Sequence, residues 1–217
     1  LLFGIFNAGF QHYAAVDAAN GIIREASFLG NFITWENFIL GSTKVLPLVI
    51  VSYVVGLTVE FIFAVIKGHE VEEGYLVTGM LVPLIVPVDL PLWMLTVAVI
   101  FGVIIGKEIF GGTGKNFLNP ALTGRVFLYF AYPTYWSVDS VWTALDGYSS
   151  PTILGIGAQE GLNGIQVNYS WFEAFVGSIP GSAGETSTLF ILLGLLLLLW
   201  TRVASWRIVI GVLIGTL

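Results

Sequence analysis

Long apolar runs alternate with short polar segments along most of the chain. The clearest run extends from Val45 to Ile66, is interrupted only by Tyr53 and Glu60, and has Lys44 and Lys67 at its two ends. A helix needs about 20 apolar residues to cross a bilayer, and lysines commonly flank such helices at headgroup depth. This run is therefore predicted to be a transmembrane helix.

The apolar runs that follow are shorter or broken. Leu76 to Val88 contains Pro83 and Pro87, and proline removes a backbone donor and clashes with the preceding helical turn. A half-helix or a re-entrant segment is therefore expected there. Two further spans are predicted at Leu92 to Gly106 and at Phe117 to Tyr132.

The charges are distributed unevenly in the second half of the chain. The segment 134–187 contains five acidic residues and no Lys or Arg, and an apolar run, Thr188 to Trp200, follows it. Basic residues gather on the cytoplasmic side of membrane proteins. We therefore expect 134–187 to be an outer acidic segment. The basic residues on either side of it are expected inside: Lys107, Lys115, Arg125, Arg202 and Arg207.

Two arrangements remain open for the first half of the chain. If Lys44 is inside, the segment that follows Lys67 is outside, and Leu76 to Val88 must enter and leave the membrane on one face. If Lys44 is outside, Leu76 to Val88 crosses fully. The acidic residues Glu70, Glu72 and Glu73 fit both arrangements.

The composition agrees with this interpretation of the apolar runs. Of the 217 residues, 56% are hydrophobic and only 10% are charged, and the mean hydropathy is +0.90. A soluble domain carries roughly a quarter charged residues. We predict an all-α membrane protein, a polytopic helical bundle with short or broken helices and a long outer loop, forming a single membrane domain over residues 1–217.

Several classes of function lack support in the sequence. The net charge of −6, from 8 basic and 14 acidic residues, argues against a nucleic-acid binder. The absence of Cys leaves no thiolate for an iron–sulfur cluster, a structural zinc or a disulfide. No Ser/His/Asp or metal-ligand set emerges, so no catalytic side chain and no metal site are expected. The apolar ends, Leu1 to Phe6 and Ile208 to Leu217, favour a piece of a longer chain.

Glu60 is the ionisable residue to explain within the first predicted span. A charged side chain in the membrane is costly unless it is paired, hydrated or protonated. One interpretation is an interfacial side chain or an internal ion pair, and the other is a cation or proton site. Gly56, one helical turn away, would let a ligand or a neighbouring helix come close.

The glycine-rich run 110–121, FGGTGKNFLNPA, joins two predicted spans. The spacing of its glycines fits neither of two phosphate-binding motifs, G-x-x-x-x-G-K-S/T and a G-x-G-x-x-G that follows a strand. One interpretation is a tight interhelical turn with a capping Asn. The other is that Asn116 and Asn119, each with an amide donor pair and an acceptor, bind a flat heteroaromatic ligand.

Two hydroxyl-rich clusters lie in the outer segment. Taken alone, residues 146–152, DGYSSPT, have the composition of an ordinary turn. Residues 180–188, PGSAGETST, are typical of a loop that leads into an N-capped helix.

These segments together resemble a known family of membrane proteins. The chain is similar, in order and over nearly its whole length, to the NqrB/RnfD family, which includes the B subunits of Na+-translocating NADH:quinone oxidoreductases. The matching stretches are FGIFNAG, KGHEVEEGYLVTGMLVPLIVPVDLPLW, GKEIFGGTGKNFLNPALTGRVFLYFAYP, VWTALDGYS, IPGSAGETSTL and RVASWRIVIGVLIG. The resemblance implies a wholly helical membrane fold, of which this chain would be the middle part.

The resemblance also implies a covalent flavin on the outer side. In the family, FMN is esterified through its phosphate to a Thr in a D-x-x-S-G-A-T segment, and the matching positions here are Asp146, Ser149 and Thr152, with Ser150-Pro151 in place of Gly-Ala. Thr186 and Thr188, in the cluster ending GETST, are the lower-ranked alternatives because this cluster has no Asp and its spacing does not fit.

Further cofactors and substrates follow from the same resemblance. It implies a noncovalent riboflavin near Asn116 and Asn119, a quinone region near Gly56, and a role for Glu60 in Na+ uptake. The second glycine that neighbours Gly56 in the family is Leu57 here.

The resulting prediction is an electron-transfer subunit of a Na+-pumping NADH:quinone reductase in the bacterial inner membrane. It would work with the other subunits of a multi-subunit complex, and a flavin transferase would attach the FMN. The alternative is a passive solute channel built from short helices and half-helices, because a Pro-broken segment and an interior acid fit such a channel equally well.

Overall fold

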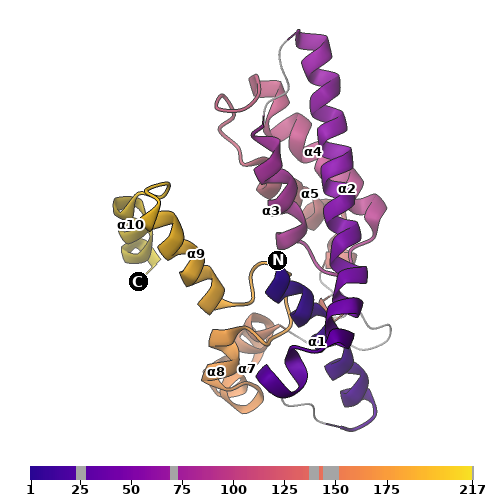
Figure 1. Cartoon of the computed structure of the whole chain (residues 1–217), viewed down its shortest axis with the longest axis vertical. Helices are drawn as coiled ribbons and strands as arrows, with labels where there is room; N and C mark the ends of the chain where they lie inside the picture. The colour runs from indigo at the N-terminus through magenta and orange to yellow at the C-terminus, as the bar shows by residue number, and fades with distance from the viewer. Residues whose placement is uncertain (23–27, 69–72, 137–141, 144–151, 217) are drawn as a thin grey trace.

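The computed structural model describes residues 1–22, 28–68, 73–136, 142–143 and 152–216. Every regular element in this part of the chain is a helix (Figure 1). The all-α prediction is therefore confirmed. The elements are α1 (Leu2–Ala19), η1 (Phe28–Phe32), α2 (Trp35–Lys67), α3 (Tyr75–Ile85), α4 (Leu92–Gly106), η2 (Glu108–Phe110), α5 (Pro120–Ala131), α6 (Pro133–Trp136), α7 (Ile153–Asn168), α8 (Trp171–Val176), α9 (Thr188–Trp200) and α10 (Trp206–Thr216).

The longest element is α2, which lies along the long axis of the molecule (Figure 1). Its 33 residues correspond to about 50 Å, which exceeds the roughly 30 Å hydrocarbon core of a bilayer. The helix begins ten residues before the predicted start at Val45, because the Thr34 side chain caps it by accepting from the Asn37 backbone N–H. It ends at Lys67, and the C-cap residue Gly68 adopts the left-handed conformation.

The helices α2, α3, α4 and α5 pack together around the main apolar core. The backbones of α4 and α5 approach closely. A Cβ on Gly102 would lie 2.5 Å from the Pro120 carbonyl oxygen. A Cβ on Gly124 would lie 2.8 Å from the Ala98 carbonyl oxygen. The glycines on facing helices therefore set this short interhelical distance.

Two ion pairs show how these helices run relative to one another. The Lys67 ammonium, at the end of α2, lies 2.9 Å from the Glu108 carboxylate just after α4, so both helices end at the same end of the body. The Lys44 ammonium, within α2, lies 2.8 Å from the Asp89 carboxylate after α3. The chain thus returns along α2 between residues 75 and 89. A full crossing by residues 76–88 agrees with this direction of the chain and stays a prediction.

The end of the outer segment packs into the body rather than staying apart from it. The buried cluster around Ala183 contacts α1, and the Gly184 backbone N–H donates to the Leu84 carbonyl oxygen at 2.9 Å. Glu185 forms an ion pair with Arg125 of α5 at 2.8 Å. The structure thus brings Arg125 into contact with the acidic segment, which the charge pattern did not indicate. Arg125 is the sixth of the 12 residues of α5, so the contact lies halfway along this helix.

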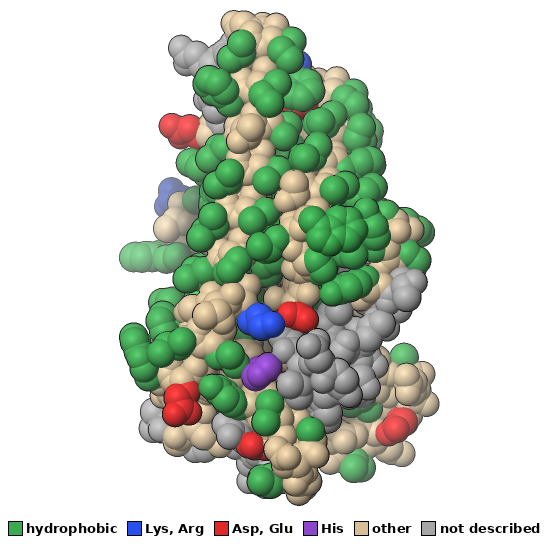
Figure 2. Space-filling model, turned by 90° about the vertical axis from the view of Figure 1, so that its right-hand side faces the viewer, with side chains coloured by type: hydrophobic (Ala, Val, Ile, Leu, Met, Phe, Trp, Pro, Cys, Tyr) green, Lys and Arg blue, Asp and Glu red, His purple; other side chains and the backbone are tan. Residues whose placement is uncertain are grey.

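The outer faces of the helices are apolar. On α2, four side chains repeat at helical spacing and are each more than half exposed, namely Ile50, Val54, Phe61 and Val65. Hydrophobic side chains also cover most of the upper helical part of the face in Figure 2. Within the described part of the chain, two helical stretches, Trp35–Lys67 and Leu92–Phe110, are long and apolar enough to cross a membrane. Exposed apolar side chains on the outer faces and buried charged residues, Glu60, Lys107 and Glu108, are as expected of a protein in lipid.

Candidate functional site

The buried face of α2 carries a line of small and polar residues. Ser52, Gly56 and Glu60 follow one another at four-residue spacing and are all buried. Residues four apart lie one above the other on a helix. Because of this spacing, the three residues share one face of α2. This face packs against α3 and α4 and lies away from the exposed apolar surface.

Tyr75, the first residue of α3, fills the space that Gly56 leaves open. Its side chain is fully buried, and its hydroxyl donates to the Ser52 carbonyl oxygen at 2.8 Å. A Cβ placed on Gly56 would lie 1.8 Å from the Tyr75 hydroxyl oxygen. The absence of a side chain at position 56 is therefore required by the tyrosine in this packing. The predicted quinone region near Gly56 is occupied by a side chain of the protein itself.

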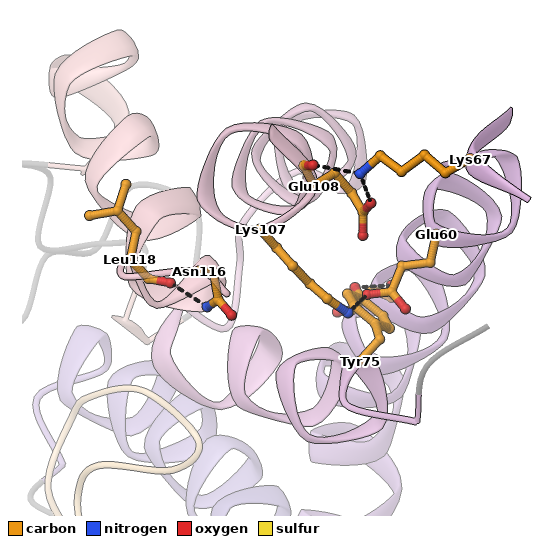
Figure 3. Close-up of polar contacts among 8 residues, drawn as sticks. Glu60, Lys67, Tyr75, Lys107, Glu108, Asn116 and Leu118 are labelled. Atoms are coloured by element: carbon orange, nitrogen blue, oxygen red, sulfur yellow. Dashed lines mark hydrogen bonds and ion pairs between the residues drawn. The ribbon is translucent and has the colours of Figure 1, made fainter. Parts of the chain in front are cut away.

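Glu60 forms a buried ion pair with Lys107, the residue that follows α4 (Figure 3). The two side chains are only 3% and 5% exposed. Of the two interpretations of Glu60, the internal ion pair is the one that the structure contains. An ion pair of this kind offsets the cost of placing a lone carboxylate in a low-dielectric environment.

A second ion pair lies directly beside the first. The Lys67 ammonium donates to the Glu108 carboxylate at 2.9 Å and to the Glu108 backbone carbonyl at 2.6 Å (Figure 3). Two residues of α2 thus pair with two consecutive residues after α4. The charges of these four side chains sum to zero.

Asn119 and Asn116 lie in the loop between η2 and α5. The Asn119 carboxamide oxygen caps α5 by accepting from the backbone N–H groups of Ala121 and Leu122, at 2.9 and 3.2 Å. Asn116 donates to the Leu118 carbonyl oxygen at 2.7 Å (Figure 3). The interhelical turn with a capping Asn is therefore confirmed. Within the described residues, the Asn119 amide nitrogen makes no hydrogen bond, so it can still donate to a ligand.

Thr152 is the N-cap of α7. Its hydroxyl is partly exposed and accepts from the Gly155 backbone N–H at 3.2 Å. Asp146 and Ser149, the other predicted residues of the flavin-attachment segment, lie outside the described residues. A helix N-terminus offers unpaired N–H groups and a positive dipole end, both of which favour an anion. The chemical environment of Thr152 therefore fits a phosphate ester.

The two alternative threonines lie in different surroundings. Thr186 is buried, and its hydroxyl accepts from the Asn7 amide at 3.4 Å. Thr188 is the first residue of α9 and is exposed. The prediction of a capped helix at this place is confirmed, because Ser187 caps α9 by accepting from the Phe190 backbone N–H.

Three residues of the buried network were not singled out from the sequence. Lys107 and Glu108 stand at the start of a polar glycine-rich run, which has the composition of an ordinary loop. Tyr75 lies at the edge of the Pro-broken segment. The available signal was charge balance, because a membrane span with an interior Glu calls for a basic partner and Lys107 directly follows a span.

Comparison with known proteins identifies relatives over the whole chain. The model of the "NQR2, RnfD, RnfE family" matches residues 1–217. The B subunit of the Na(+)-translocating NADH-quinone reductase of Chromohalobacter salexigens is 53% identical over 224 residues, which cover 99% of this chain and 54% of that protein. The corresponding B subunits of Stutzerimonas stutzeri and Neisseria meningitidis are 46% and 45% identical and cover 99% and 94% of this chain.

The matches cover a larger share of this chain than of its relatives. The chain spans about half the length of the curated relatives it matches, while the relatives cover nearly all of it. On the match over residues 1–217 and the identities of 45–53%, the chain belongs to the NQR2, RnfD, RnfE family.

Proposed function

We propose that this chain forms part of the membrane-embedded B subunit of a Na+-translocating NADH:quinone reductase. The observation that carries the proposal is the 53% identity over 99% of the chain to a protein of that name. The buried Glu60 in an apolar helix supports it, because acids within membrane spans commonly mark ion pathways. The protein would be a multi-pass component of the bacterial inner membrane and would act with the other subunits of the complex.

The chain would hold two flavins. Thr152 would carry FMN through a phosphoester made by a flavin transferase, and Asp146 and Ser149 would belong to the segment that the transferase recognises. The position of Thr152 at the N-terminus of α7 supports this role, because the helix end stabilises the negative charge of the ester. Asn116 and Asn119 would hold a noncovalent riboflavin. The amide nitrogen of Asn119 supports this second role, because capping uses only the oxygen of that side chain.

When bound, flavins supply one- and two-electron transfer, and the protein supplies position and electrostatics. The chain would orient the flavins by Thr152 and the two asparagines. It would place a quinone near Gly56 and would provide the Glu60 carboxylate to a cation. Quinone binding near Gly56 would require Tyr75 to move, because its ring fills that space.

A denaturing gel tests this proposal. The full-length subunit, purified from its native membrane, is expected to show a flavin-fluorescent band under ultraviolet light. A colourless protein without fluorescence would overturn the proposal and would favour a passive solute channel. Extraction with acid before the gel separates noncovalent riboflavin from the covalent FMN.

A further inference from the structure

Among the described residues, the two ion pairs between α2 and the end of α4 contain equal numbers of carboxylates and ammonium groups. Glu60 and Glu108 contribute two carboxylates, and Lys67 and Lys107 contribute two ammonium groups. A carboxylate that binds Na+ offsets the cost of dehydrating the ion with its own charge. In this arrangement the ammonium of Lys107 already performs that role at Glu60.

The pair is also closed to water. Both side chains are at least 95% buried, whereas the Lys67 side chain in the neighbouring pair is 30% exposed. A Na+ ion added beside the intact pair would place an uncompensated positive charge in a low-dielectric region. Exchange of one cation for another at the same carboxylate avoids that cost.

Lysine is suited to such an exchange. Its ammonium is a compact charge at the end of a flexible four-carbon chain, so it can leave a carboxylate through side-chain rotation alone. Lys107 stands immediately after the last turn of α4, where the backbone is no longer helical. Withdrawal of the ammonium therefore does not require α4 to move.

We propose that Lys107 is the resident counter-ion of Glu60 and that Na+ binds Glu60 only when the Lys107 ammonium withdraws. This inference rests on the proposed role of Glu60 in the ion pathway and assigns the residue that controls it. Lys107 is a positioning residue, because it acts through Glu60. Na+ and the Lys107 ammonium then compete for one carboxylate.

The test uses the assembled complex with Lys107→Gln, which removes the competing charge. The Na+ concentration for half-maximal quinone reduction is expected to fall on the order of tenfold, within the usual range of coupling between two bound groups. The melting temperature of this variant is expected to rise with NaCl and not with choline chloride at the same ionic strength, because the unpaired carboxylate requires a cation. An unchanged or higher half-maximal concentration, or an equal response to choline, would overturn the proposal.

Lys44→Gln is the matched control. It removes an ammonium from an ion pair on the same helix, with Asp89, where both side chains are about one-third exposed. Its Na+ response is expected to equal that of the unmodified complex. A shift as large as that of Lys107→Gln would show a general charge effect and would contradict the proposal.

Two more variants keep the test decisive if Lys107→Gln does not accumulate. Lys107→Arg retains the charge and adds a bidentate fork, so it is expected to raise the half-maximal Na+ concentration; no rise contradicts the proposal. The double variant Glu60→Gln/Lys107→Gln removes both partners and is expected to lose the Na+-specific gain in melting temperature. Retention of that gain would place the cation elsewhere. The melting experiment requires no electron transfer, so its result stands apart from that of the flavin gel.

Discussion

The Tyr75 hydroxyl lies in the space where a side chain of Gly56 would be. A Cβ on Gly56 would approach the Tyr75 hydroxyl oxygen to 1.8 Å and its ring carbon Cζ to 1.9 Å. The ring is held there by a hydrogen bond from its hydroxyl to the Ser52 carbonyl oxygen. The α2–α3 contact therefore depends on the combination of a glycine and a tyrosine.

Gly56→Ala is expected to destabilise the protein by about 1–3 kcal/mol, because overpacking forces the Tyr75 ring to shift. Adding Tyr75→Leu should recover part of this loss, since the smaller side chain leaves room for the methyl group. Thermal unfolding of the detergent-solubilised subunit measures both effects. Gly194→Ala in α9, where nothing lies within 4 Å, is the control. Additive losses in the double variant would contradict the packing account.

Glu60→Gln is expected to lower stability on the order of 3 kcal/mol, because it leaves the Lys107 ammonium buried without a charged partner. The double variant Glu60→Gln/Lys107→Gln should recover most of that loss, and unfolding of both variants in detergent measures it. In the assembled complex, Glu60→Gln should also raise the Na+ concentration for half-maximal quinone reduction while the flavin content stays unchanged. Unchanged Na+ dependence in a fully flavinylated variant would leave Glu60 with a structural role alone.

Asn119 offers a way to separate helix capping from flavin binding. Asn119→Asp keeps the oxygen that caps α5 and removes the amide donor, so stability should be retained while riboflavin is lost. Asn119→Ala removes both groups and should also cost about 1 kcal/mol of stability. Riboflavin released by acid, measured per mole of protein, checks the ligand arm. Full riboflavin content in Asn119→Asp would show that this amide does not bind the flavin.

The absence of cysteine allows a direct test of sidedness. Lys115→Cys, in the exposed loop before α5, should react with a membrane-impermeant thiol reagent from the cytoplasmic side. Glu36→Cys and Gln159→Cys, at exposed positions on α2 and α7, should react from the opposite side. Labelling of all three from one side would contradict a full crossing by α2.

The helices of strongest apolar character could be predicted from sequence. The bounds expected for α4 and α9, Leu92 to Gly106 and Thr188 to Trp200, are those in the structure. The start of α2 could not be predicted, because the first ten residues of this helix are partly polar. One of these residues, Asn37, is buried and satisfies its side-chain amide with the backbone carbonyls of Asn31 and Phe32. From sequence alone, polar residues at this place suggest the end of a membrane helix, because their hydrogen bonds inside the protein cannot be seen.

The sequence indicated Glu60 as a candidate site residue, but it did not indicate that Lys107 and Tyr75 would lie near it. Glu60 stands out because a charge in an apolar run needs an explanation. Lys107 is 47 residues away and Tyr75 is 15 residues away, and nothing in the local pattern indicates which face each will reach. The contact between Arg125 and Glu185 was missed for a related reason, since a charge rule for loops carries no information about a loop that packs inward.

The most direct test of the account is the mass of the peptide that contains Thr152. No Lys or Arg lies between Arg125 and Arg202, so chymotrypsin is the suitable protease, and its cleavage at aromatic residues separates Thr152 from Thr186 and Thr188. In the protein purified from its native membrane, the Thr152 peptide is expected to carry the mass of one FMN less one water. Thr152→Val should lose this adduct while the protein still inserts in the membrane. An unmodified Thr152 peptide, or an adduct on Thr186 or Thr188, would contradict the account.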